Sequence, residues 1–155
     1  MSDEVVPGLT VRRAVPGDVA AATRCVCAAY LRYIERVGRQ PWPMLQDYAQ
    51  VLLSSEVHIA ERDGRVVGVL ELVETEEGFL LDSVAVDPDA QGTGVGRTLL
   101  ALAEAEARRH GYDSIYLMTN ERMTENQDLY SRIGYVLYDR RMVHGYARVF
   151  MRKQL

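Results

Sequence analysis

The chain has 155 residues, 48% of them hydrophobic, which is typical of one globular domain with a substantial core. Its net charge of −4 argues against a surface that binds nucleic acid or anionic lipid. Two cysteines, three histidines and the absence of a signal peptide or long apolar run argue against a disulfide framework, a metal centre and a membrane partner. We therefore expect one cytoplasmic domain over residues 1–155.

The first elements in chain order are a strand and two helices. Residues 10–15 are short and β-branched, which predicts a strand. Apolar residues spaced three or four apart predict an amphipathic helix over 18–37, which Gly38 ends. Two prolines flank the only tryptophan in residues 39–44, so this segment is expected to be non-helical. A second helix is expected over 45–53.

The middle of the chain predicts three strands and a long helix. Residues 57–61 and 66–73 are joined by Asp63-Gly64, a strong hairpin signal. Residues 80–86 are mostly apolar and β-branched, which suits a buried strand. After a glycine-rich turn, apolar residues every four positions predict a helix from Val95, with Gly111 just beyond its end.

The last third predicts a strand, a helix and two further strands. Residues 114–118 read as a short buried strand. A Thr-x-x-Gln capping box predicts a helix over 124–133. Strands follow at 136–138 and 147–152, with 142–145 in a long turn.

The order of these elements predicts the fold class. A strand–helix–strand crossover makes the strands at 80–86 and 114–118 parallel, whereas the Asp63-Gly64 hairpin is antiparallel. We therefore expect an α/β (α+β) domain with a mixed, mainly antiparallel central sheet flanked by helices.

The glycine-rich turn at 91–97 predicts an anion site. A helix that begins in such a turn presents unpaired backbone N–H groups and its positive dipole end, which suit phosphate or diphosphate. The alternative is a tight turn that binds nothing. A P-loop is excluded, because Gln91 and Arg97 stand where it needs glycine and lysine, and Arg97 also breaks a dinucleotide fingerprint. The pattern present is Gln-x-x-Gly-x-Gly, with Gln91, Gly94 and Gly96.

At a strand-to-helix junction, this pattern resembles the acetyl-CoA diphosphate loop of the GCN5-related N-acetyltransferases (GNAT), and the element order resembles that fold over nearly the whole chain. A second motif agrees, because Tyr130, Gly134 and Tyr135 resemble a family helix with a tyrosine four residues before a Gly-aromatic pair. The asparagine common in the family is Met123 here, but Asn126 shares a helix face with Tyr130.

The resemblance implies direct transfer of acetyl from acetyl-CoA to a primary amine of a small molecule or peptide. Tyr130 is expected to act as the general acid that protonates the CoA thiolate, the alternative being a core tyrosine. The acceptor amine needs a base, for which Glu71 and Asp82 are the candidates, with Glu74 nearby. Each could instead be a charge at a strand edge.

The resemblance also implies two sets of binding residues. The cofactor-binding candidates are Val84, Ala85, Val86, Gln91, Gly92, Thr93, Gly94, Val95, Gly96, Arg97, Thr98, Asn120, Asn126, Leu129 and Tyr130. The candidates that wall the acceptor pocket are Tyr30, Tyr33, Trp42 and Met44. Within these sets, Arg97 could instead be solvated, and Trp42 could be a pocket lid or a contact in a homodimer.

Two other functions compete with catalysis. A non-catalytic acyl-CoA-binding or sensor module of the same fold would use the same loop without acetylating an amine. A nucleotide-binding protein is disfavoured by the failed P-loop pattern.

Overall fold

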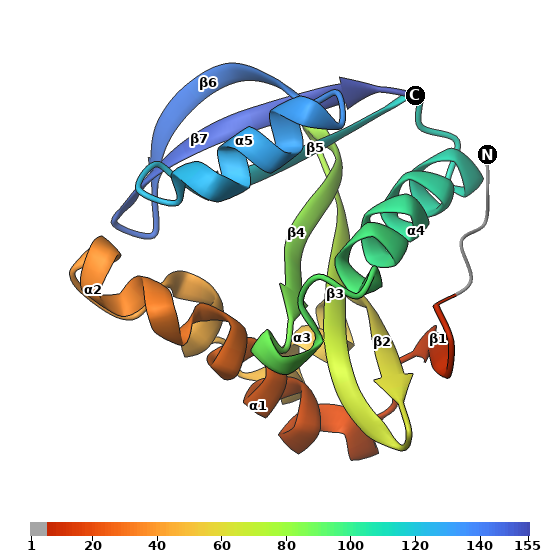
Figure 1. The fold of residues 1–155 in the computed structure, drawn as a ribbon. Helices are drawn as coiled ribbons and strands as arrows, with labels where there is room; N and C mark the ends of the chain where they lie inside the picture. The colour runs from red at the N-terminus through yellow and green to blue at the C-terminus, as the bar shows by residue number, and fades with distance from the viewer. Residues whose placement is uncertain (1–5) are drawn as a thin grey trace.

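One sheet of seven strands runs through the molecule in the order β1-β2-β3-β4-β5-β7-β6 (Figure 1). The computed structural model describes residues 6–155, so the first five residues of the expected domain lie outside the described residues. All neighbouring strands are antiparallel except β4 and β5, which confirms the mixed, mainly antiparallel sheet. The strands are β1 Leu9–Arg13, β2 Glu56–Arg62, β3 Arg65–Thr75, β4 Gly78–Val86, β5 Ser114–Asn120, β6 Val136–Val143 and β7 Tyr146–Gln154.

Helices cover both faces of this sheet (Figure 1). They are α1 Val19–Tyr30, α2 Ile34–Val37, α3 Tyr48–Ser54, α4 Val95–Arg109 and α5 Thr124–Arg132. The apolar stripes of α1 and α3 pack on one side of β2, β3 and β4, around Ile59 and Val69. The stripe of α4 packs on the other side, around Leu70 and Leu81. Alternate strand residues thus supply two cores, as a sheet buried on both faces requires. No helix within residues 6–155 combines the length and apolarity needed to cross a membrane.

The sheet opens in its middle. Strands β4 and β5 pair at only three positions, Phe79 with Ile115, Leu80 with Tyr116 and Leu81 with Leu117. A bulge in β4 follows at Asp82, which has no partner between the Leu72–Leu81 and Glu71–Ser83 pairs. Beyond it β4 stays paired with β3 and β5 with β7, so the two halves of the sheet diverge. This gap positions the site described below.

The close approach of α4 to the sheet depends on Gly68 in β3. A Cβ atom there would lie 2.8 Å from Leu99 Cδ1 and 3.0 Å from Val95 Cγ1. We expect Gly68→Val to lower the free energy of unfolding by about 2 kcal/mol, because overpacking displaces α4. Urea denaturation measures this change. Gly17→Ala is the control, since no atom lies within 4 Å of a Cβ at Gly17, and an equal loss in both variants would contradict the packing argument.

Two predicted segments near the N-terminus differ from the structure. The single helix expected over 18–37 is broken after Tyr30 by a 3-10 turn, and α2 then ends at Gly38, whose φ is 89°. The segment expected to be non-helical forms a 3-10 turn at Trp42–Leu45, since proline is tolerated in a first turn. The next helix begins at Tyr48 rather than 45, because the Asp47 side chain caps it by accepting from Ala49 N–H at 3.0 Å.

Two predictions in the C-terminal third are also wrong. Helix α5 begins at the expected place, but its N-cap is Met123 and no capping box forms. The Gln127 side chain instead donates to the carbonyl of Glu121 at 3.0 Å. The long turn expected at 142–145 is a tight hairpin, in which His144 and Gly145 have φ values of 52° and 79° between β6 and β7. Two consecutive positive φ values suit the twist of a hairpin.

A carboxylate network anchors the start of α1. Arg12 in β1 donates two hydrogen bonds of 2.8 Å to Asp18, which also accepts from Val15 N–H at 2.7 Å. Hydrogen bonds from Arg12 lower the pKa of Asp18, although burial opposes this. Because its folded-state pKa lies below the ordinary value, Asp18 contributes stability above about pH 4 and loses it as pH falls through the lowered value.

We therefore expect Asp18→Asn to lower the free energy of unfolding by about 1–3 kcal/mol at pH 7 and by less at pH 3. Urea denaturation at the two pH values measures the difference. An equal loss at both pH values would contradict the charge-based explanation.

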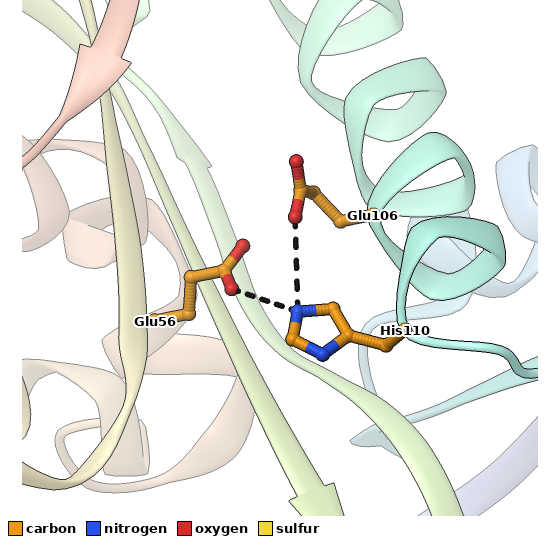
Figure 2. A group of neighbouring side chains, drawn as sticks. All are labelled: Glu56, Glu106 and His110. Carbon is orange, nitrogen blue, oxygen red and sulfur yellow. Dashed lines mark hydrogen bonds and ion pairs between the residues drawn. The ribbon is translucent and has the colours of Figure 1, made fainter.

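A second polar cluster ties the end of α4 to β2. Figure 2 shows Glu56 and Glu106 aimed at the same ring nitrogen of His110, at 3.1 and 3.8 Å. Glu56 also contacts His58 at 2.7 Å. One ligand atom from each of Glu56, Glu106 and His110 lies within 4.8 Å of the others, and such a group could hold a metal ion. Arg109 already pairs with Glu106 at 2.6 Å, however, so the cluster is charge-compensated without one.

Candidate active site

A cleft of about 360 Å³ lies where the two halves of the sheet diverge. It is walled by the end of α1, the C-terminal part of β4, the glycine-rich turn and α5. Its volume falls in the range that binds cofactors and small ligands. The lining residues are Ala29, Tyr30, Arg32, Tyr33, Val84, Ala85, Val86, Gln91, Gly92, Gly96, Leu100, Glu125, Asn126, Leu129, Tyr130 and Arg132.

One end of this cleft is the N-terminus of α4. Gly94 is the N-cap in a left-handed conformation, with a φ of 95°, which a residue with a side chain rarely adopts. The first intrahelical bond runs from Thr98 N–H to the Gly94 carbonyl at 3.0 Å. The N–H groups of Val95 and Gly96 precede it, so the helix itself gives them no acceptor. With Arg32 donating to the Gln91 side chain at 3.4 Å, this end also carries positive charge and suits a phosphate group.

The other end opens into a deeper, narrow pocket of about 40 Å³. Four residues line both spaces, so the cleft and the pocket are continuous: Tyr30, Val84, Asn126 and Tyr130. The remaining pocket residues are Pro41, Trp42, Pro43, Leu81, Asp82, Ser83, Leu117, Met118, Thr119, Asn120, Met123, Tyr146 and Arg148.

Tyr130 and Tyr30 lie at the junction where the cleft meets the pocket. Tyr130 on α5 is 7% exposed and packs edge-on to Tyr135 with ring centroids 5.8 Å apart. Burial raises the pKa of Tyr130 well above its ordinary value, and nearby tyrosines add to this. Burial also raises the pKa of Tyr30 to about 12. Both hydroxyls are therefore protonated at neutral pH and can donate a proton or a hydrogen bond.

The backbone of β4 faces the gap at Val84. Its carbonyl accepts a hydrogen bond from the Tyr30 hydroxyl at 3.5 Å, although Tyr30 comes from α1. The N–H and C=O of one strand residue point to the same side. The Val84 N–H is therefore directed into the gap too, where it can donate to an oxygen that gains negative charge.

The two carboxylates expected to act as bases occupy different environments. Asp82, at the bulge, lines the deeper pocket. Glu71 is 2% exposed and is not among the residues that line either space. Burial, with the neighbouring Asp82 carboxylate, raises the pKa of Glu71, so this side chain is protonated at neutral pH. Asp82 is thus the carboxylate that can meet a ligand directly.

The structure brings together most, but not all, of the predicted binding residues. Tyr33 lines the cleft, Trp42 the pocket, and Asn120 lies in the pocket rather than the cleft. Several predicted residues line neither space: Thr93, Gly94, Val95, Arg97, Thr98 and Met44. Two of these have structural roles, since Val95 is 1% exposed in the core and the Thr98 hydroxyl donates to the Gly94 carbonyl at 2.9 Å.

Strand β7 also lines the pocket, although no sequence motif marks this strand as part of the site. Tyr146 and Arg148 alternate with Ala147, and both point into the pocket. In the sequence, only the alternation of side chains along the last strand indicates that Tyr146 and Arg148 share a face. Residues 41–43 close another side of the pocket. Two contacts hold this segment: the Tyr146 hydroxyl donates to the Gln40 carbonyl, and Trp42 stacks on His144 with ring centroids 4.0 Å apart.

Comparison with known proteins places this architecture among characterised folds. A family model described as an acetyltransferase (GNAT) domain matches residues 54–137. Mycothiol acetyltransferase of Cellulomonas flavigena is 32% identical over 85% of this chain and 42% of its own length. Aminoalkylphosphonate N-acetyltransferase of Salmonella typhimurium is 28% identical over 86% of this chain and 88% of its own. This chain therefore spans less than half the length of the first of these relatives.

A solved structure supports the same fold. The PaiA N-acetyltransferase of Thermoplasma acidophilum, in complex with coenzyme A, superposes with a TM-score of 0.78. The match covers 95% of this chain and 99% of that one at 15% sequence identity. At this identity the likeness establishes the fold alone.

Proposed function

Because this chain belongs to the GNAT acetyltransferase family, we propose that it transfers the acetyl group of acetyl-CoA directly to a primary amine of a small molecule or peptide. One observation carries the proposal. The N-terminus of α4, the open edge of β4 and the Tyr130 hydroxyl line one continuous cleft, which ends in a pocket for a second molecule. The curated relatives are named as acetyltransferases, which supports the same chemistry.

The cleft provides a place for each part of the cofactor. The diphosphate lies at the N-terminus of α4, where backbone N–H groups of the glycine-rich turn and the Arg132 side chain complement its charge. The pantetheine arm runs along β4 from Val86 toward Val84, whose edge is unpaired with β5. The thioester then reaches the junction between Tyr30 and Tyr130.

In the proposed reaction the amine lone pair forms a C–N bond with the thioester carbonyl carbon. The Val84 N–H donates to the carbonyl oxygen as negative charge builds there. The C–S bond then breaks with its electron pair on sulfur, and the Tyr130 hydroxyl gives its proton to that sulfur. Asp82 accepts the proton lost by the amine and passes it to solvent, and Tyr130 regains a proton from solvent, which restores both side chains. Protonated Glu71, behind Asp82, takes no direct part.

Release of the CoA thiol tests this proposal. We expect the protein to release thiol from acetyl-CoA only when a suitable amine is present, with acetylated amine formed in equal amount. A panel of amino acids, aminophosphonates, polyamines, aminoglycosides and peptides provides the acceptors. Saturable acetyl-CoA binding in calorimetry without acetylation of any of them would instead support the non-catalytic acyl-CoA-binding module.

We also propose a cytoplasmic homodimer. Cys25 and Cys27 are free thiols, which suits a reducing compartment. Strand β6 is an edge strand in which Val136 and Met142 are each 68% exposed, and these apolar side chains are available to a second copy. Light scattering is expected to give twice the mass of 17.5 kDa; a monomer at high concentration would contradict the dimer.

A further inference from the structure

Arg148 lies in the deeper pocket without a protein partner for its charge. The residue is 8% exposed, and its side chain lines the pocket beside Asp82 and Tyr146. Among residues 6–155, no hydrogen bond or ion pair engages its guanidinium group. Its contact is with the Tyr146 ring, whose centroid is 5.8 Å from the guanidinium carbon. The pocket therefore contains a buried cation that faces empty space.

Such an arrangement is unfavourable unless a ligand completes it. Burial lowers the pKa of Arg148, but a guanidinium remains charged in any folded protein. An uncompensated buried charge destabilises the folded state, which is why buried cations are normally paired. Even Arg12, Arg65 and Arg141, whose side chains are much more exposed, each pair with a carboxylate within 3.1 Å. Within residues 6–155, Arg148 is thus a buried arginine whose guanidinium forms no ion pair.

The chemistry of the pocket indicates which kind of ligand would pair with Arg148. A planar guanidinium presents two parallel N–H donors that match the oxygens of a carboxylate, phosphonate or phosphate. Asp82 lines the same pocket and its charge favours the Arg148 cation, but the two side chains form no direct ion pair. A molecule with an ammonium group near Asp82 and an acidic group at Arg148 would satisfy both. The volume of about 40 Å³ limits that molecule to a small one.

We propose that Arg148 is the specificity-determining residue for the acceptor, and that the acceptor is a small amine bearing an anionic group. This inference rests on the proposed function for the transfer step. The bidentate contact fixes the acid end of the acceptor, so that its amino end is directed toward the thioester at Tyr130. An amine of the same size without an anionic group leaves the buried guanidinium unpaired and is disfavoured.

Matched acceptor pairs test the proposal by thiol release. β-Alanine is compared with propylamine, and 2-aminoethylphosphonate with ethanolamine; these pairs also distinguish carboxylate from phosphonate. We expect kcat/KM to favour the anionic member of at least one pair by about 100-fold. In Arg148→Met that preference is expected to fall below about 5-fold through a higher KM, whereas the Kd for acetyl-CoA stays unchanged.

Two controls separate specificity from folding. The Arg148→Met variant removes an unpaired buried charge, so its unfolding temperature is expected to equal or exceed that of the wild type. Arg140→Met changes an exposed arginine on neighbouring β6 that is not part of the site, and its substrate preference should not change. Equal turnover by the wild type of amines with and without an anionic group, or an equal loss for both in Arg148→Met, would overturn the proposal.

Direct binding distinguishes this proposal from the proposed function. If no amine is acetylated, calorimetry with β-alanine and 2-aminoethylphosphonate still decides the role of Arg148. Saturable binding that Arg148→Met abolishes and Arg140→Met retains would support the anion site while rejecting catalysis. Absence of binding to the wild type, with or without acetyl-CoA, would reject the anion site even if other amines are acetylated.

Discussion

Replacing Tyr130 with phenylalanine is expected to lower kcat by about 10²- to 10³-fold, while the Kd for acetyl-CoA changes less than about 3-fold. The substitution removes only the hydroxyl that faces the junction of cleft and pocket, and the ring keeps its packing. The departing thiolate then has no proton donor on α5. Steady-state thiol release gives kcat, and calorimetry gives the dissociation constant.

Tyr135→Phe is the matched control for this experiment. Tyr135 packs against Tyr130, is 2% exposed, and its hydroxyl has no hydrogen-bond partner within the described residues. Removing that hydroxyl should leave kcat unchanged, because it lines neither the cleft nor the pocket. If Tyr130→Phe retains kcat within about 2-fold, Tyr130 is not the proton donor, and Tyr30, at the same junction, becomes the next residue to test.

Replacing Gly96 with aspartate is expected to weaken acetyl-CoA binding by about 100-fold without destabilising the protein. A carboxylate in the first turn of a helix is favoured by the dipole, and aspartate also has a higher helix propensity than glycine. A Cβ atom at Gly96 meets only Val86 Cγ2, at an ordinary 3.5 Å. The new charge would lie at the proposed diphosphate site, so the two anions would repel each other.

Calorimetry with acetyl-CoA and thermal unfolding without it measure the two effects separately. Gly96→Ala is the control, because it adds the Cβ atom without the charge and should keep binding within about 5-fold. Binding by Gly96→Asp with wild-type affinity would place the phosphates elsewhere and would remove the main argument for the cofactor site.

The fold was predictable because its main signals are local. Asp63-Gly64 adopts φ values of 53° and 76°, the hairpin turn that this dipeptide favours. The helix after the glycine-rich turn begins at Val95 as expected, and the crossover makes β4 and β5 parallel. Errors occurred where a tertiary contact decides the outcome. The Gln127 side chain, for example, bonds to backbone carbonyls before the helix instead of completing a capping box.

The site was predictable only on the side that carries a motif. Gln91, Gly92, Gly96 and Tyr130 line the cleft, as expected from the loop and the helix. The separation of β4 from β5 depends on which residues pair across the sheet, and no local pattern encodes it. Arg148 could not be identified for the same reason, because an arginine in a terminal strand is usually solvated and only the fold shows that this one is enclosed.

The short pairing between β4 and β5, at only three positions, has a mechanical consequence. Phe79, Leu80 and Leu81 are the only β4 residues that pair with β5, so few backbone hydrogen bonds hold the two half-sheets together. A ligand bound in the gap would contact both half-sheets and hold them together. Amide hydrogen exchange should therefore slow on both sides of the gap, in α1 as well as in α5, when such a ligand is added.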